Sequence, residues 1–255
     1  MHDDRSDPGI PHAGATEGGR AVIRGRLTIF AGAAPGVGKT WAMLSAAREE
    51  AARRSVLVGV VEFHGRSEAE SLLAGLEVLP PRPGSFRDAG LRELDLDAAL
   101  ARRPSLLVVD TLAHGNAPGG RHPKRWQDVR ELLDAGIDVF TALDVQELEG
   151  LGDVVFRIAG AVPDETVPDA LFDSADEVRV VDLAPERLLE RWREGKVRFR
   201  GSPERGAALF REGSLIALRA LFLRRMAERV DAQMQDYRRG QGVEQAWAAS
   251  DRILV

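Results

Sequence analysis

A segment near the N-terminus most constrains what this chain can fold into. Residues 27–31 form an apolar run that ends at Gly32, and the next stretch, Ala33 to Thr40, reads A-A-P-G-V-G-K-T. Helix formers then fill residues 40–53. A strand, a glycine-containing loop and a helix in this order bring backbone N–H groups and the positive end of a helix dipole to one point. The segment therefore predicts an anion-binding loop of the P-loop kind.

The spacing of this loop follows the Walker A pattern, with Ala33 where the strict pattern has glycine. In such a loop the lysine reaches the β- and γ-phosphates of a nucleotide, and the hydroxyl of the next residue ligates Mg²⁺. We therefore expect ATP with Mg²⁺, held by Gly32, Ala33, Ala34, Pro35, Gly36, Val37, Gly38, Lys39 and Thr40.

Apolar runs alternate with helical patterns along the next 150 residues. The runs predict strands at 56–61, 106–110, 137–143 and 178–183. Among the helices predicted between them is one covering about 146–159. Alternation of this kind favours βαβ units with right-handed crossovers. The predicted fold class is α/β, a P-loop NTPase-like parallel sheet with flanking helices and a C-terminal helical extension.

A long helix is predicted from a cap at Ser214 to about Arg239. One apolar stripe has helical spacing, and it comprises Leu215, Leu218, Phe222, Met226, Val230, Met234 and Tyr237. Arginines occupy the other face, at Arg219, Arg224, Arg225, Arg229, Arg238 and Arg239. Two interpretations stay open: a helix docked on its own domain, or a linker or homodimer helix.

The pattern divides the chain into four parts. Residues 1–25 are polar and aperiodic, which predicts a disordered leader. The P-loop domain is expected over 26–200 and the helical extension over 201–240. Residues 241–255 end in R-I-L-V and are expected to begin a following domain.

A P-loop needs a second group for its metal, and Asp110 follows an apolar strand as a Walker B aspartate does. We expect Asp110 to hold Mg²⁺ through water; the alternative is a simple cap at the strand end. Thr111 stands where a glutamate often activates water, and it has no basic group at neutral pH, so hydrolysis is expected to be slow. Glu62 is a candidate for that base or, equally, a solvated charge.

Loops that follow parallel strands gather at one edge of a sheet, so further residues are expected near the phosphates. Arg66 and Arg121 are candidate phosphate contacts, and the neighbouring Lys124 and Arg125 are weighed with them. The histidines carry no zinc-binding spacing, and the chain has no cysteine, so no zinc site is expected.

Composition narrows the function classes. The 35 basic and 40 acidic residues give a net charge of −5, which argues against bulk attraction to nucleic acid. No apolar run approaches the ~20 residues of a membrane span, and no secretory signal is visible, so a cytosolic location is expected.

Several strings resemble the N-terminal cytoplasmic domain of the KdpD family of potassium-responsive sensor histidine kinases. They include V-G-V-V-E-F-H-G-R and A-P-G-G-R-H-P-K-R-W-Q-D-V, and the resemblance runs from about residue 25 to 239. It implies an ATP-binding domain that adjusts the kinase/phosphatase balance of distant domains. It also implies a universal-stress-protein-like domain, transmembrane helices and a kinase core beyond this segment, on the cytoplasmic side of the inner membrane.

The chain departs from the pattern of that family at loop positions. Glutamate is replaced by Thr111, asparagine by Asp144, histidine by Glu147, threonine by Phe63 and arginine by Asp164. Because the P-loop is intact, the resemblance implies retained binding with altered or absent hydrolysis.

The sequence leaves three functions open. The first is a regulatory ATP-binding module of such a kinase, working by conformational change and joined to other domains of the sensor. The alternative is a free-standing P-loop ATPase or small-molecule phosphotransferase, and the third is a scaffold with a decayed site. No kinase core is present, so autophosphorylation by these residues is not expected, and no motif separates ATP from GTP.

Overall fold

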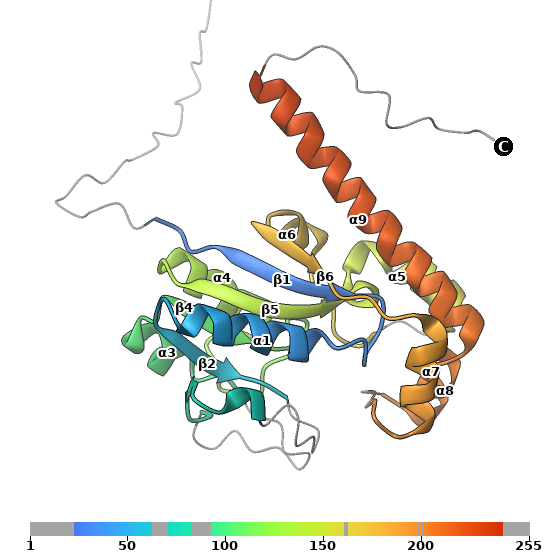
Figure 1. Ribbon diagram of the computed structural model, residues 1–255, viewed down its shortest axis with the longest axis horizontal. Helices are drawn as coiled ribbons and strands as arrows, with labels where there is room; N and C mark the ends of the chain where they lie inside the picture. Colours follow the sequence, from blue (N-terminus) through green and yellow to red (C-terminus); the bar gives the residue numbers. More distant parts are fainter. Residues whose placement is uncertain are drawn as a thin grey trace, which may run out of the picture.

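A six-stranded, all-parallel sheet lies at the centre of the computed structural model, which describes residues 23–62, 71–82, 93–160, 163–197, 199 and 201–241 (Figure 1). The strand order is β3-β2-β4-β5-β1-β6. The strands are β1 Leu27–Gly32, β2 Val56–Val60, β3 Glu77–Val78, β4 Leu106–Val109, β5 Asp138–Asp144 and β6 Glu177–Val180. The predicted α/β fold class is confirmed.

Helices cover both faces of the sheet. They are α1 Lys39–Ala51, α3 Leu96–Arg102, α4 Arg125–Asp134, α5 Gly152–Ala159, α6 Asp169–Asp173, α7 Pro185–Arg193, α8 Pro203–Leu209 and α9 Glu212–Gln241, with two 3₁₀ turns, η1 Val145–Glu147 and η2 Glu149–Leu151. Alternate residues of β1 point to opposite faces. Ile29 packs in the cluster that includes Leu132 of α4, and Phe30 packs in the cluster that includes Met43 of α1.

The C-terminal helices pack against the loop that follows β1. A third apolar cluster joins Ala34 and Val37 of this loop to Leu209, Leu215 and Leu218. A side chain at Gly36 would meet Val197, since an added Cβ would lie 2.5 Å from its Cγ2. The loop therefore packs against α8 and α9. The predicted domain boundary at residue 200 stays a prediction.

Three local predictions need correction. The helix predicted over 146–159 is broken into η1, η2 and α5. The short elements β3, α6 and α8 were not predicted, because two to seven residues carry too little periodicity. Ser214 does not cap the long helix; it lies inside α9, is buried, and its hydroxyl donates to the Ile158 carbonyl.

The long helix α9 docks on its own domain by only part of the predicted stripe. Leu215, Leu218 and Phe222 are buried, whereas Val230 and Tyr237 are exposed. Several arginines of the other face bind the domain. Arg229 donates to the carbonyls of Phe172, Asp173 and Ala175, Arg225 pairs with Asp173, and Arg219 pairs with Asp182.

Candidate functional site

The carboxyl ends of the strands bring the predicted site residues to one edge of the sheet. Gly32 at the end of β1 pairs in register with Asp144 at the end of β5. Asp110 follows β4, and Glu62 lies two residues after β2. Because β5 runs between β1 and β4, Asp144 lies between the glycine-containing loop and Asp110.

The loop after β1 has the backbone that an anion cradle requires. Gly36 and Gly38 have φ values of +90° and +109°, which side chains rarely adopt. A Cβ added at Gly38 would meet no atom within 4 Å, so the space beside this glycine is open. In the part of the chain described here, α1 starts at Lys39 with neither a side-chain cap nor an acid in its first turn. The positive end of α1 is therefore available to an anion.

Lys39 is held by a carboxylate at this edge. Its Nζ lies 2.5 Å from Oδ1 of Asp144 and donates also to the Ala34 carbonyl at 3.3 Å. Both side chains of the ion pair are nearly buried, with 11% and 9% exposed. An anion at the loop would compete with Asp144 for the same ammonium group.

Thr40 and Asp110 face each other across the sheet edge. The Thr40 hydroxyl donates to Oδ2 of Asp110 at 3.0 Å, and the Glu62 backbone N–H reaches the same oxygen at 3.4 Å. Burial, followed by the nearby charge of Glu62, raises the pKa of Asp110 to about 6. A hydroxyl and a carboxylate oxygen at this distance are hard oxygen ligands of the kind that suit Mg²⁺.

A second, partly buried acid follows Asp144 in η1. Glu147 accepts a hydrogen bond from the Asp144 backbone N–H at 2.8 Å. Burial, together with the charge of Asp144, raises the pKa of Glu147 to about 8. Glu147 is therefore largely protonated at neutral pH, and Asp144 supplies the negative charge that pairs with Lys39.

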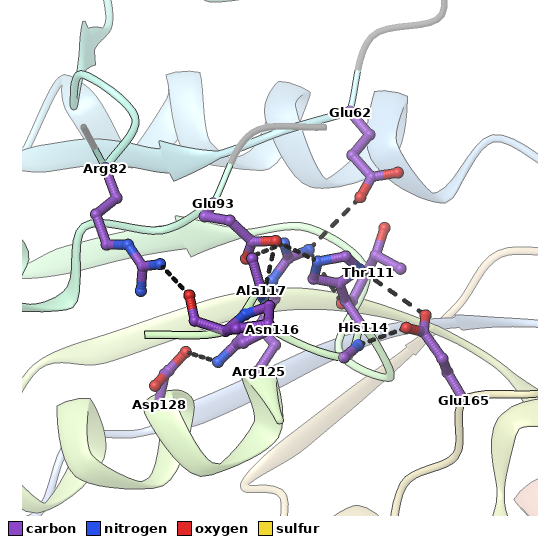
Figure 2. Close-up of polar contacts among 12 residues, drawn as sticks. Glu62, Arg82, Glu93, Thr111, His114, Asn116, Ala117, Arg125, Asp128 and Glu165 are labelled. Atoms are coloured by element: carbon purple, nitrogen blue, oxygen red, sulfur yellow. Dashed lines mark hydrogen bonds and ion pairs between the residues drawn. The ribbon is translucent and has the colours of Figure 1, made fainter. Parts of the chain in front are cut away.

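A fully buried arginine supports the Asp110 side of the site (Figure 2). Arg125, at the start of α4, is 0% exposed and donates from Nη1 to the Asp110 carbonyl at 2.8 Å. The same Nη1 lies 3.6 Å from Glu62, and Nη2 lies 4.0 Å from Glu93. These contacts tie the carboxyl ends of β2 and β4 to α4.

The network continues away from the loop through His114. Its Nε2 lies 3.1 Å from Glu93, and its Nδ1 lies 3.8 Å from Glu165. Glu93 also accepts from the Ala117 N–H, and Glu165 accepts from the Gly115 N–H at 2.6 Å (Figure 2). Side chains from distant segments therefore fix the loop that follows Asp110.

Thr111, next to Asp110, has a strained backbone. Its φ is +56°, a left-handed conformation that a β-branched residue adopts at a cost. Its N–H donates to Asp110 Oδ1 at 3.0 Å, and its carbonyl accepts from Arg125. These contacts hold the strained backbone in place, and both oxygens of the Asp110 carboxylate are hydrogen-bonded, Oδ1 by Thr111 and Oδ2 by Thr40.

Comparison with known proteins decides the family. Residues 23–230 match the family model described as KdpD, osmosensitive K⁺ channel His kinase sensor domain. The chain is 55% identical over 237 residues to the sensor protein KdpD of Escherichia coli (strain K12), covering 92% of this chain and 26% of that protein.

This chain belongs to the KdpD family. A KdpD sensor protein of Mycobacterium tuberculosis (strain H37Rv) is 46% identical over 91% of this chain and 27% of its own length. A putative KdpD sensor protein of Synechocystis is 43% identical over 91% of this chain and 62% of its own length. The chain thus spans about a quarter of the first two relatives. None of the helices described for this KdpD chain is long and apolar enough to cross a membrane.

The structure of this KdpD chain brings most predicted site residues together. Lys39, Thr40, Asp110 and Glu62 converge at the carboxyl edge. The Glu62 side chain faces Arg125, and its role as a base stays a prediction. Arg66 lies outside the described residues, as do 1–22 of the predicted leader and 242–255 of the predicted following domain.

Among the basic residues that follow β4, the one that contacts Asp110 is Arg125 and not Arg121. Arg121 forms salt bridges with Asp97 and Glu131, and its assignment as a phosphate contact stays a prediction. Arg125 instead reaches the Asp110 backbone. The sequence signal for Arg125 was its place in the R-H-P-K-R-W-Q-D string of the family, whereas Glu93 carried no signal.

Proposed function

We propose that this chain is an ATP-binding regulatory domain of a KdpD sensor kinase, with slow or absent hydrolysis. The observation that carries the proposal is the arrangement of Lys39 and Thr40 at the open positive end of α1, with Asp110 bonded to Thr40 at 3.0 Å. We assign Lys39 to the phosphates and Thr40 with Asp110 to Mg²⁺. ATP is chosen over GTP only by the family resemblance.

The residues fit the nucleotide in a defined way. The N–H groups at the start of α1 and Lys39 would hold the phosphates, and Thr40 and Asp110 would hold Mg²⁺ directly or through water. Bound Mg²⁺ supplies charge neutralisation between the phosphates. Lys39 must leave Asp144 to reach a phosphate, so binding is coupled to the loss of this ion pair at the end of β5.

The coupling gives a route to regulation. Asp144 continues into η1, and η1 contacts α9, while Ala34 and Val37 of the loop share a cluster with Leu215 and Leu218 of α9. A change at the phosphate loop is thus transmitted to the C-terminal helix by direct packing. In the longer relatives, further chain is present to receive such a movement.

Thermal unfolding with and without Mg-ATP tests the proposal. A ligand that binds only the folded state stabilises it by about 2.7 kcal/mol at 100 times its Kd. We expect this stabilisation in the native chain and its loss in Lys39→Ala. Lys196→Ala is the matched control, because Lys196 is exposed and pairs only with the neighbouring Glu194 in the part of the chain described.

Metal dependence gives a second readout. Asp110→Asn should weaken binding of Mg-ATP more than binding of ATP with EDTA, because Asn removes the negative charge that faces the metal. Parallel titrations with GTP decide the base. An unchanged melting temperature at millimolar Mg-ATP would overturn the proposal, and rapid phosphate release would favour the ATPase alternative.

A further inference from the structure

Exposed apolar residues form a seam along α9 on a face that does not contact the domain, and the last three residues of this seam also end the stripe predicted from the sequence. The members of the seam are separated alternately by four and three residues, and they are Ile216, Ala220, Leu223, Ala227, Val230, Met234 and Tyr237. All seven are exposed, including Ile216 at 50% and Tyr237 at 63%. At 100° per residue this seam lies about a third of a turn from Leu215 and Phe222, which face the domain.

The spacing is that of a coiled-coil seam. Apolar residues that alternate by three and four keep one face toward a partner helix over three heptads. The second half of α9 also extends beyond the domain (Figure 1), and residues 230–240 include no buried side chain. Three helical turns without packing are marginal in water. Both observations leave this face of α9 available to a partner helix.

We propose that α9 pairs with α9 of a second copy of this chain as an antiparallel coiled coil. The fit of large and small residues favours this orientation. With Ala227 opposite Val230, the facing layers become Leu223 with Met234 and Ala220 with Tyr237, and each layer occurs twice by symmetry. Every alanine then faces a larger side chain, which fills the seam evenly. A parallel pair would place each alanine against its own copy and leave gaps.

Charges beside the seam select the same register. In an antiparallel pair, residues that directly follow every second seam position face one another across the seam. Arg224 follows Leu223, and Asp231 follows Val230. Arg224 therefore falls opposite Asp231 of the partner subunit, and symmetry repeats this contact. Neither residue forms a salt bridge among the described residues. Shifting the register by one heptad in either direction sets Arg224 against an arginine. A parallel pair sets Arg219 against Arg224 of the partner subunit. Like charges in these positions disfavour the alternatives.

Sedimentation of the full chain tests the association. Over about 1 to 100 µM protein, we expect the mass to rise from 27.8 kDa to twice that value, because association depends on protomer concentration. Val230→Glu, in the seam, should keep the chain monomeric. Ala232→Glu adds the same charge on another exposed face of α9 and should leave the dimer intact. A native chain that stays monomeric throughout would overturn the proposal.

Charge exchange tests the register. Asp231→Arg should weaken the dimer about tenfold, since two attractive contacts become repulsive. Adding Arg224→Asp to that variant should restore it. Asp236→Arg makes the same charge change at a residue that pairs with Arg239 off the seam, and it should have little effect. Equal effects of Asp231→Arg and Asp236→Arg would contradict the register.

Cross-linking tests the orientation, and the absence of cysteine from the chain gives a clean background. Leu223→Cys and Met234→Cys should each stay uncross-linked alone, because the two equivalent sites lie about 16 Å apart along the helix axis. Mixed and oxidised, the two variants should form a disulfide-linked dimer. Cross-linking of either variant with itself would indicate a parallel pair and overturn the proposal. None of these measurements involves nucleotide, so the outcome is independent of the proposed function.

Discussion

The two edges of the central sheet both carry charged pairs, but they bury them to different degrees. At the carboxyl edge, Arg125 is fully buried, and its partners Glu62 and Glu93 have side chains 8% and 3% exposed. At the amino edge, Arg54 and Asp138 form a salt bridge with 28% and 24% exposed. Arg179 and Glu177 on β6 are about 40% exposed.

This difference in burial indicates that the carboxyl edge carries a larger desolvation cost than the amino edge. Removing charges from water is costly even when they pair, and a buried pair is often no better than a hydrophobic substitute. The amino edge keeps its charges partly hydrated and avoids this cost. The carboxyl edge combines buried charges with raised pKa values and a strained Thr111, which is typical of functional sites.

The largest effect should come from removing the buried arginine. Arg125→Met leaves Glu62 and Glu93 buried without their cation, so we expect a loss of about 3–5 kcal/mol in the free energy of unfolding. Arg54→Met, at the amino edge, should cost less than about 1 kcal/mol, since its partners stay hydrated. Urea denaturation measures both variants. Equal losses would remove the contrast between the two edges.

The pH dependence of stability should follow Glu147. Its pKa of about 8 in the folded chain exceeds the ordinary 4.5, so the stability associated with its protonation is complete below pH 4.5 and is lost as pH rises to 8. Glu147→Gln keeps the oxygen that accepts from Asp144 and removes the titration. We expect this variant to lose a few kcal/mol less than the native chain between pH 5 and 8. Parallel declines, measured by denaturant unfolding at each pH, would show that Glu147 ionises normally.

Nucleotide affinity should respond to Asp144, if the proposed function holds. Asp144→Asn removes the carboxylate that competes with phosphate for Lys39, so Mg-ATP should bind about tenfold more tightly. Asp138→Asn, at the opposite end of β5, is the matched control and should leave the affinity unchanged. Isothermal titration distinguishes the two, and tighter binding in both variants would indicate an effect of net charge.

The smallest effect should come from backbone strain. Thr111→Gly relieves a φ of +56° and should raise the free energy of unfolding by about 0.5–1 kcal/mol, after the entropic cost of glycine. Arg103, with φ +46° at the end of α3, is the control outside the site. Arg103→Gly should gain less, because arginine is not β-branched. A loss of stability in Thr111→Gly would show that the threonine side chain contributes more than its backbone costs.

Prediction from sequence succeeded where the signal is local. The loop from Ala33 to Thr40 and the strand before Asp110 are continuous patterns, and both lie where expected. Arg125 was weighed only as one of several basic residues after β4, because nothing in its neighbourhood along the chain indicates that it is buried. The sequence pattern likewise placed Leu215 and Val230 on one apolar stripe of α9, but only Leu215 is buried.

The sequence by itself determined the parallel α/β fold and the strand–loop–helix segment that predicts phosphate binding, because both depend on periodicity and short spacings. Only the tertiary structure decided that Lys39 is paired with Asp144, 105 residues away, and that Arg125 lies buried beneath Asp110. It also decided which face of α9 is left exposed. Such contacts depend on strand order and on the packing of distant segments, and no local pattern records them.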